Sequence, residues 1–462
     1  METRWVSFGR AGASGMAAGA LVGVAAVMLA GTAVAHRLAV DASEPLLEVT
    51  HLPVLLTAGG EPVELRYDVY CSGEGDSEAA DCEATGTVYV RSGGTSGEFD
   101  AIALQEDAGA SEGRFVAQVS DTIARSRAGF SYYAVLRSSS SGRAVTLPAG
   151  GAAAPHESRP LVRAAAVVLG SHVFDRTRSA DERVAEAAWG EGDGEVGLEE
   201  GHNLAPIGGS AFDVDASGTV HVLDEANRRV LRWSSGRRGP QHVPLAIRGT
   251  LADLSVAEDG AMYVLETTAD TGRSPLMRIF AADGAARGVV EMAERAAAVR
   301  MGPNGPVALQ QPSGQWMRAA SSGRPLPGGD QARSGRSGRP LADGGEVIVL
   351  RVGNEVRVAL VGRNGARRSW RVTSDTALAE VQLAEPLGDR LLLVVRAYTD
   401  AESEFVALLL DRDGLAQRFS LSSADWAETA PLSRFRLAGS SLYRLGSTPQ
   451  GIFVDRFDLE VR

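Results

Sequence analysis

The hydrophobic residues of this 462-residue chain occur in short runs in which apolar and polar positions alternate. Between residues 44 and 147, glycine-rich or polar turns separate these runs. The alternating runs are 62–70, 86–91, 98–104, 113–119, 129–137 and 143–147. Alternation with a period of two predicts strands, and this spacing is typical of an antiparallel sandwich of about 100 residues.

A segment rich in Pro, Gly and Ala at residues 148–155 interrupts the alternation. Such a composition predicts a boundary between two domains. We therefore expect four parts: a signal peptide or membrane anchor at 1–35, a sandwich at 41–148, a linker at 149–180 and a second domain at 181–462.

Turn glycines recur through the second domain at intervals of roughly forty residues. The first series, expected after the innermost strand of each unit, is Gly218, Gly260, Gly305, Gly344, Gly388 and Gly439. The second, expected in the hairpin after the third strand, is Gly236, Gly284, Gly323, Gly365 and Gly414. Two interleaved series predict four-stranded blades, and six blades predict a β-propeller.

Residues 212–230 resemble an NHL repeat, because an inner strand, a glycine turn, an apolar strand ending in an acid and an Asn-Arg-Arg-Val sequence follow one another. A second copy starts at residue 254. Residues 129–137 are similar to the penultimate strand of fibronectin type III and bacterial immunoglobulin-like modules. These resemblances imply an all-β chain, with an immunoglobulin-like sandwich followed by a six-bladed, NHL-like β-propeller.

The glycine series has six inner turns but only five outer hairpins, so the last blade lacks its outer strand. An unpaired strand edge promotes aggregation. We therefore expect residues 183–189 to close the ring by pairing with residues 451–459 in antiparallel fashion.

The N-terminus has the pattern of an export signal. Arg4 and Arg10 precede an uncharged stretch at 11–35 that ends in Ala-Val-Ala. A basic segment, an apolar segment and a small-x-small site are typical of a cleavable signal peptide. The same stretch is long enough to remain as a membrane anchor. We expect an exported protein, whether secreted, periplasmic or in the cell envelope.

The two cysteines, Cys71 and Cys82, flank a polar loop in the expected sandwich. An oxidising compartment would allow a structural disulfide between them. Two free thiols are the alternative. The sequence contains no CxxC pair, which is the spacing that would indicate a redox or metal role.

The net charge of −12 argues against a nucleic-acid partner. The insertion at 321–345 is nevertheless basic, with Arg324, Arg333, Arg336 and Arg339. It can be interpreted as a finger for an acidic polymer or as a disordered blade loop. We favour the loop because no aromatic residue lies between the arginines.

Motifs that carry chemistry are few. Residues 192–197 match GxGxxG, but acidic neighbours and the lack of a flanking strand and helix favour a plain loop. The spacing of Asp213, Asp215, Ser217, Gly218 and Asp224 is that of a calcium loop. An NHL-like strand and turn requires the same residues, and Asp224 would lie a strand away from the other two acids, so we favour the structural interpretation. His221 is expected on a strand face.

We expect a non-enzymatic binding or scaffold protein that presents propeller loops to a protein or glycan, without a cofactor and with membrane contact only through the N-terminal segment. The alternative is a metal-dependent propeller hydrolase or lyase of the gluconolactonase type, which uses Glu, Asn and Asp ligands on the inner strands. Inner segments 298–302 and 435–439 offer no such ligand.

Overall fold

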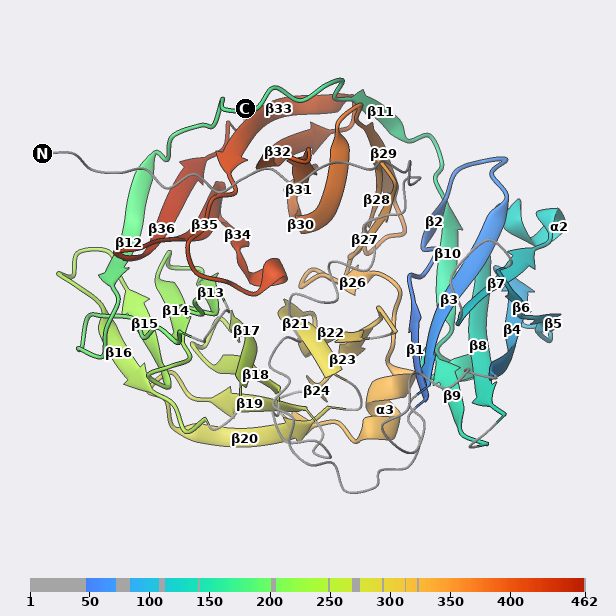
Figure 1. Ribbon diagram of the computed structural model, residues 1–462, viewed down its shortest axis with the longest axis horizontal. Helices are drawn as coiled ribbons and strands as arrows, with labels where there is room; N and C mark the ends of the chain where they lie inside the picture. Colours follow the sequence, from blue (N-terminus) through green and yellow to red (C-terminus); the bar gives the residue numbers. More distant parts are fainter. Residues whose placement is uncertain are drawn as a thin grey trace, which may run out of the picture. The chain divides into compact units, whose positions relative to one another are not determined.

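A computed structural model describes residues 47–71, 84–107, 113–139, 142–200, 205–247, 250–267, 275–292, 295–311, 313–321 and 324–460. The described residues are almost entirely β-structure (Figure 1). Within these ranges, no helix combines the length and apolarity that a bilayer crossing requires. The segment 1–35, expected to be a signal peptide or anchor, lies outside them.

The N-terminal part contains two sheets with alternating buried and exposed positions. The first has the order β1 (Leu47–His51), β3 (Val63–Cys71), β7 (Arg114–Val119), β6 (Gln105–Glu106). The second has the order β2 (Leu56–Thr57), β10 (His156–Pro160), β8 (Phe130–Ser138), β4 (Ala84–Ser92), β5 (Asp100–Ala103), with β9 (Ala144–Leu147) also on β8. Inward side chains of both sheets form one hydrophobic cluster, as period-two alternation requires.

Tyr132, near the start of β8, links the two sheets of this part. Its hydroxyl accepts a hydrogen bond from the Val54 backbone N–H at 2.9 Å and lies 2.9 Å from His51 Nε2. His51 Nδ1 donates to the Arg66 carbonyl at 2.6 Å, so Nε2 accepts a hydrogen bond from the Tyr132 hydroxyl. Burial lowers the pKa of His51 to about 4. The imidazole is therefore neutral near pH 7.

The C-terminal part consists of small sheets around a ring (Figure 1). The first sheet has the order β13 (Ala211–Val214), β14 (Val220–Asp224), β15 (Arg229–Trp233), β16 (Gln241–Pro244), and the second β17 (Thr250–Val256), β18 (Met262–Thr267), β19 (Leu276–Phe280), β20 (Ala286–Glu291). A three-stranded sheet has the order β21 (Arg295–Gly302), β22 (Gly305–Gln311), β23 (Trp316–Arg318). Another four-stranded sheet has the order β30 (Ala377–Leu387), β31 (Arg390–Tyr398), β32 (Ser403–Asp411), β33 (Gly414–Ser422). The innermost strands of neighbouring sheets contact each other, as β13 does with β17 and β17 with β21. This arrangement is propeller-like.

Two further sheets recruit strands that precede the ring in sequence. One has the order β11 (Ala165–Val168), β29 (Arg367–Thr373), β28 (Glu355–Val361), β27 (Glu346–Val352), β26 (Arg339–Pro340), and the other β12 (Glu182–Ala188), β36 (Gly451–Asp458), β35 (Ser441–Thr448), β34 (Phe435–Ala438). Strand β12 pairs with β36 in antiparallel fashion. The expected ring closure is confirmed, since the predicted segment is strand rather than helix and pairs with the predicted partner.

The predicted inner-turn glycines all have positive φ, as Gly218 does at 81°. Five of them lie between the first and second strands of their sheets, and Gly305 is the first residue of β22. A side chain is strained in that backbone region, which explains why glycine recurs there. Of the second series, Gly323 lies outside the described residues.

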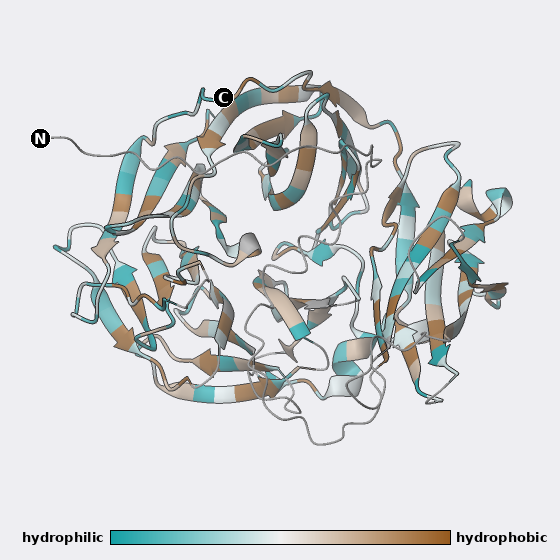
Figure 2. Ribbon diagram, viewed as in Figure 1, coloured by the Kyte–Doolittle hydropathy of each residue, from teal (hydrophilic) through white to brown (hydrophobic). Residues whose placement is uncertain are grey.

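Hydrophobic clusters fill the space between most neighbouring sheets. Figure 2 shows the corresponding bands of hydrophobic and hydrophilic residues along strands such as β12. Among the described residues, the exception is the junction between the β21–β23 sheet and the β26–β29 sheet, where no cluster joins the two. The insertion at 321–345 lies at this junction.

Two expectations about irregular segments are wrong. Residues 149–180 are not simply a linker, because β10 pairs with β8 and β11 pairs in parallel with β29. The insertion is not a disordered loop where it is described: it contains the short helix α3 (Gly328–Arg333) and β26. Gln331 anchors α3 by donating to the carbonyls of Glu291 and Leu326 at 2.7 and 2.8 Å.

Candidate functional site

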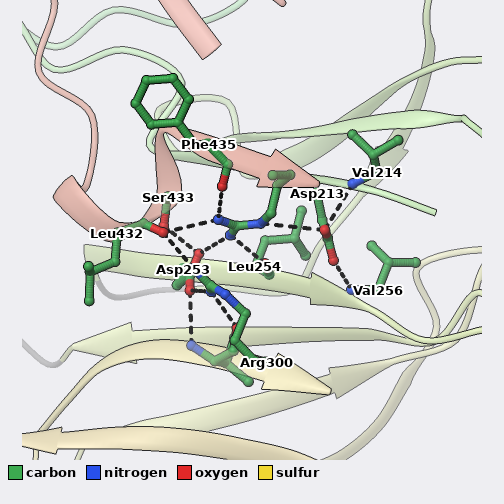
Figure 3. Close-up of polar contacts among 11 residues, drawn as sticks. Asp213, Val214, Asp253, Leu254, Val256, Arg300, Leu432, Ser433 and Phe435 are labelled. Carbon is green, nitrogen blue, oxygen red and sulfur yellow. Dashed lines mark hydrogen bonds and ion pairs between the residues drawn. The ribbon is translucent and has the colours of Figure 1, made fainter. Parts of the chain in front are cut away.

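Charged side chains from four innermost segments meet at the centre of the ring (Figure 3). We call them the central network, which consists of Asp213 on β13, Asp253 on β17, Arg300 on β21, Arg436 on β34, and Ser433 in the short 3-10 helix η2 (Pro431–Ser433) just before β34. The contacts of β13 with β17, of β17 with β21, and of β13 with β34 bring these side chains together.

Asp253 is the hub of the central network. Its Oδ2 accepts hydrogen bonds from Arg300 Nη1 at 2.5 Å and from the Val299 backbone N–H at 2.9 Å. Its Oδ1 accepts from Arg436 Nη2 at 2.8 Å and from the Ser433 hydroxyl. A fully buried carboxylate is stable only when such donors replace water.

Arg436 joins this hub to the neighbouring sheet. Its Nε lies 3.4 Å from Asp213 Oδ1, and its Nη1 donates to the carbonyls of Leu432 and Phe435 at 3.0 and 2.9 Å. Asp213 Oδ2 also accepts the Val256 N–H at 2.7 Å. The network therefore joins β13, β17, β21 and β34 across the centre.

The electrostatics follow from burial and pairing. Burial opposes ionisation of Asp253, but Arg300 and Arg436 hold its pKa below the usual range. Burial raises the pKa of Asp213, and Arg436 offsets this only in part. Two acids therefore face two arginines, and a divalent cation between these acids would meet both guanidinium groups. The residues present do not fit a catalytic metal of the gluconolactonase type.

The acids with calcium-loop spacing do not converge. Asp215 Oδ1 accepts from the Ser217 N–H and hydroxyl at 2.9 and 2.6 Å, and closes the turn. Asp224 Oδ2 accepts from Arg229 Nε at 2.8 Å and Asn227 Nδ2 at 2.9 Å, while Asp213 faces the central network. In the described ranges, no group of three His, Cys, Asp or Glu residues could hold a metal.

His221 lies on the face of β14, as expected. Its Nδ1 accepts from Arg232 Nε at 3.2 Å, and its Nε2 lies 3.1 Å from Asp215 Oδ2. Burial lowers its pKa, although Asp215 partly offsets that effect. These contacts explain His221 as a neutral turn support.

The GxGxxG segment at 192–197 is a loop without a helix after it. Arg229 Nη2 donates to the carbonyls of Gly192 and Glu195, both at 2.7 Å. The Gly197 N–H donates to Asp224 Oδ1 at 3.0 Å. Because its backbone is bound by the acid and arginine of the NHL-like segment, this loop is structural.

Glu225 is a partly buried carboxyl of a different kind. Burial raises its pKa to about 7, and the Leu251 N–H, which donates to Oε1 at 3.0 Å, lowers it only in part. Glu199 adds like-charge repulsion. Glu225 lines neither the cavity beside β10 nor the smaller one beside β33.

A cleft of about 730 Å³ opens where the β21–β23 and β26–β29 sheets meet β10. Its lining contains five arginines and two acids. Arg318, Arg336 and Arg363 are exposed and have no acidic partner among the described residues. We call this cavity the arginine cleft, defined by those three arginines and the half-buried Trp316.

The walls of the arginine cleft are joined by hydrogen bonds. Arg159 on β10 donates to Glu346 at 3.0 Å and to Glu157 at 2.9 Å. The Glu157 N–H donates to Ser337 at 2.7 Å, and Gln315 Nε2 donates to the Ala154 carbonyl at 3.0 Å. Both acids of the cleft are therefore already paired with Arg159.

Sequence reasoning missed most of these residues. Arg300 and Arg436 lie in the inner segments 298–302 and 435–439, which offer no metal ligand. An arginine on an inner strand was the signal in the sequence that could have indicated an ion pair at the centre of the ring. Asp213 and Arg300 each stand five positions before their turn glycine, so aligning the repeats places both near the axis. Arg336 was identified in the basic insertion, but Arg318 and Arg363 come from other segments.

The predicted disulfide concerns Cys71 and Cys82. Cys82 lies outside the described residues, and nothing is described of the Cys71 side chain. The bond therefore remains a prediction.

Comparison with known proteins gives no family for this chain. No family model matches it, and no curated protein matches it. A catalytically inactive virginiamycin B lyase from Staphylococcus aureus with quinupristin matches at 11% identity and a TM-score of 0.34, over 57% of this chain and 98% of its own. A putative 6-phosphogluconolactonase from Bacteroides fragilis matches at 12% identity and a TM-score of 0.32, over 83% of this chain and 97% of its own. BamB from Moraxella catarrhalis matches at 11% identity and a TM-score of 0.28, over 61% of this chain and 98% of its own. Likenesses this distant support no conclusion about function, so the propeller-like architecture stands on the strand pairing of this chain itself.

Proposed function

We propose that this chain is an exported, non-enzymatic binding or scaffold protein, built from an immunoglobulin-like sandwich followed by a six-bladed, NHL-like β-propeller. The sheet orders and the β12–β36 closure support the blade count. The two packed sheets and Tyr132 support the sandwich assignment. Export rests on the N-terminal segment alone.

One observation carries the non-enzymatic assignment: both acids at the ring centre already pair with arginines. A hydrolase or lyase needs a free acid, base or metal ligand in a site that substrate can enter. The arginine cleft, in contrast, offers unpaired donors on an open surface, which suits binding.

A combined assay separates binding from catalysis. The full chain, purified from the envelope of its native cells, is analysed for bound metal and tested on lactone substrates with and without added Mn²⁺, Ca²⁺ or Zn²⁺. In parallel it serves as bait for envelope proteins and glycans.

We expect no stoichiometric metal, no turnover and a retained partner. Turnover that requires one bound metal and disappears in both Asp213→Asn and Asp253→Asn would instead establish the gluconolactonase-type alternative. The exposed Asp193→Asn variant is the matched control for loss of one acid.

A further inference from the structure

We propose that the arginine cleft binds a carboxylated polysaccharide, with Arg318, Arg336 and Arg363 pairing with uronate carboxylates and Trp316 packing against a sugar ring. This inference rests on the proposed binding function and specifies its ligand class. The charge, the shape and the composition of the cleft each support it.

The charge of the cleft is opposite to that of the whole protein. The chain carries a net charge of −12, yet five arginines and only two acids line this cavity. Both acids are engaged by Arg159, which forms ion pairs with Glu157 and Glu346. Apart from Arg333, which pairs with Asp330 at 2.6 Å, the remaining arginines are free to receive anionic groups.

The three free arginines of the cleft lie on three separate segments of the chain. Arg318 ends β23, Arg336 follows α3, and Arg363 lies in the turn between β28 and β29. The backbone of Arg336 pairs with that of Trp316 in both directions at 2.9 and 3.0 Å, which fixes the arginine beside the indole. A guanidinium is a planar fork that matches a carboxylate, so several of them on separate walls suit a ligand with repeated carboxylates.

The cavity has the size and polarity of a carbohydrate site. Its volume of about 730 Å³ lies in the range of small-ligand sites. Trp316 provides an apolar surface, and Asn304 an exposed amide. An acidic peptide can be recognised by an arginine cluster alone, whereas a sugar also presents an apolar C–H face to an aromatic ring and hydroxyl groups to an amide. Aromatic, amide and arginine groups together therefore favour an acidic glycan.

The fold holds the cleft open through contacts that do not involve its free arginines. Ser337, Gln315 and Arg159 join the walls by hydrogen bonds. The site therefore needs little rearrangement on binding, which reduces the entropic cost of association. It also means that the free arginines can be replaced without unlocking the walls.

Titration calorimetry of the full chain with oligogalacturonate tests the proposal. We compare wild type with R318Q/R336Q/R363Q and with the control R137Q/R238Q/R412Q, which removes three exposed arginines elsewhere. We expect the cleft variant to bind at least about tenfold more weakly, the control to bind like wild type, and added NaCl to weaken wild-type binding. Neutral dextran is expected not to bind.

Several outcomes would overturn the proposal. One is that the cleft variant binds oligogalacturonate as tightly as wild type does, and another is that wild type does not bind it. A third is that wild type binds poly-glutamate as tightly as oligogalacturonate and that the cleft variant loses both, which would assign the cleft to acidic peptides. The single charge reversals R336E and R363E serve if the triple variant does not fold. Retention of an envelope partner by wild type, together with no oligogalacturonate binding by wild type, would refute this inference and leave the proposed function standing. Metal-dependent turnover would refute the proposed function.

Discussion

Arg436 at the centre of the ring and Arg363 at the rim of the cleft have the same side chain in opposite surroundings. Arg436 is buried, and its N–H groups reach Asp253, Asp213 and two carbonyls. Arg363 is exposed beside a cavity and faces no acid among the described residues. Buried charges that are fully paired fix strands in place, whereas exposed and unpaired charges remain available to a ligand.

The comparison also separates two kinds of sheet junction. Around most of the ring, hydrophobic clusters and the central network hold neighbouring sheets together. At the cleft, the β21–β23 and β26–β29 sheets are joined through α3, β10 and polar contacts such as Ser337 with the Glu157 N–H. The one junction without a cluster in the described structure is thus the one with the large cavity.

The largest effect is expected from opening the ring. Deletion of Glu182–Ala188 removes β12 and leaves the edge of β36 unpaired. Exposed edges template pairing with other chains. We expect aggregation during purification, measured by size-exclusion chromatography. A monomeric product with wild-type stability would contradict the role of β12 in closure.

Asp253→Asn tests whether the central network holds the ring together. It leaves Arg300 and Arg436 buried without their shared acid, so the expected loss in the free energy of unfolding is about 3–5 kcal/mol. The measurement is urea unfolding at pH 7. Asp413→Asn, at an exposed site, should change stability by less than about 0.5 kcal/mol. Equal effects from the two substitutions would remove the distinction between buried and exposed charges.

Glu225 differs from Asp253, because it is a partly buried acid whose pKa is raised rather than lowered. Its folded pKa of about 7 exceeds the ordinary value of 4.5, so the folded state binds more protons between these values. This stabilisation is complete below pH 4.5 and is lost as pH rises through 7, by up to about 3 kcal/mol. Urea unfolding at pH 5 and pH 8 should show the loss in wild type and a much smaller one in Glu225→Gln. Identical pH profiles would show that Glu225 does not titrate as described.

The smallest effect on stability is expected in the cleft. Each of R318Q, R336Q and R363Q should change the free energy of unfolding by less than about 0.5 kcal/mol, because these side chains are exposed and unpaired. Thermal unfolding followed by circular dichroism measures this. A loss of several kcal/mol from any one of them would mean that the cleft arginines are structural.

The strands were more predictable than the charges. Turn glycines such as Gly218 and Gly439 located the ring hairpins because positive φ restricts the residue type. Short strands such as β2 and β10 were missed, since pairing from a distance, not local alternation, defines them. In the same way, the ion pair of Arg300 with Asp253 joins different sheets, and no spacing rule within one strand reveals it.

The cleft was the least predictable feature. Arg318, Arg336 and Arg363 belong to three segments, and β10 lies more than 150 residues before them. The insertion alone offered no aromatic residue, because Trp316 precedes it in sequence. The site becomes visible only when tertiary pairing brings the indole beside Arg336.

The shift of the thermal unfolding midpoint caused by oligogalacturonate tests the division between ring and cleft most directly. A ligand that binds only the folded state raises this midpoint. We expect a rise in wild type, a retained rise in the destabilised Asp253→Asn variant, and no rise in R318Q/R336Q/R363Q despite its near-normal starting stability. A rise that persists in the cleft variant, or disappears only in Asp253→Asn, would contradict the assignment of structure to the centre and binding to the cleft.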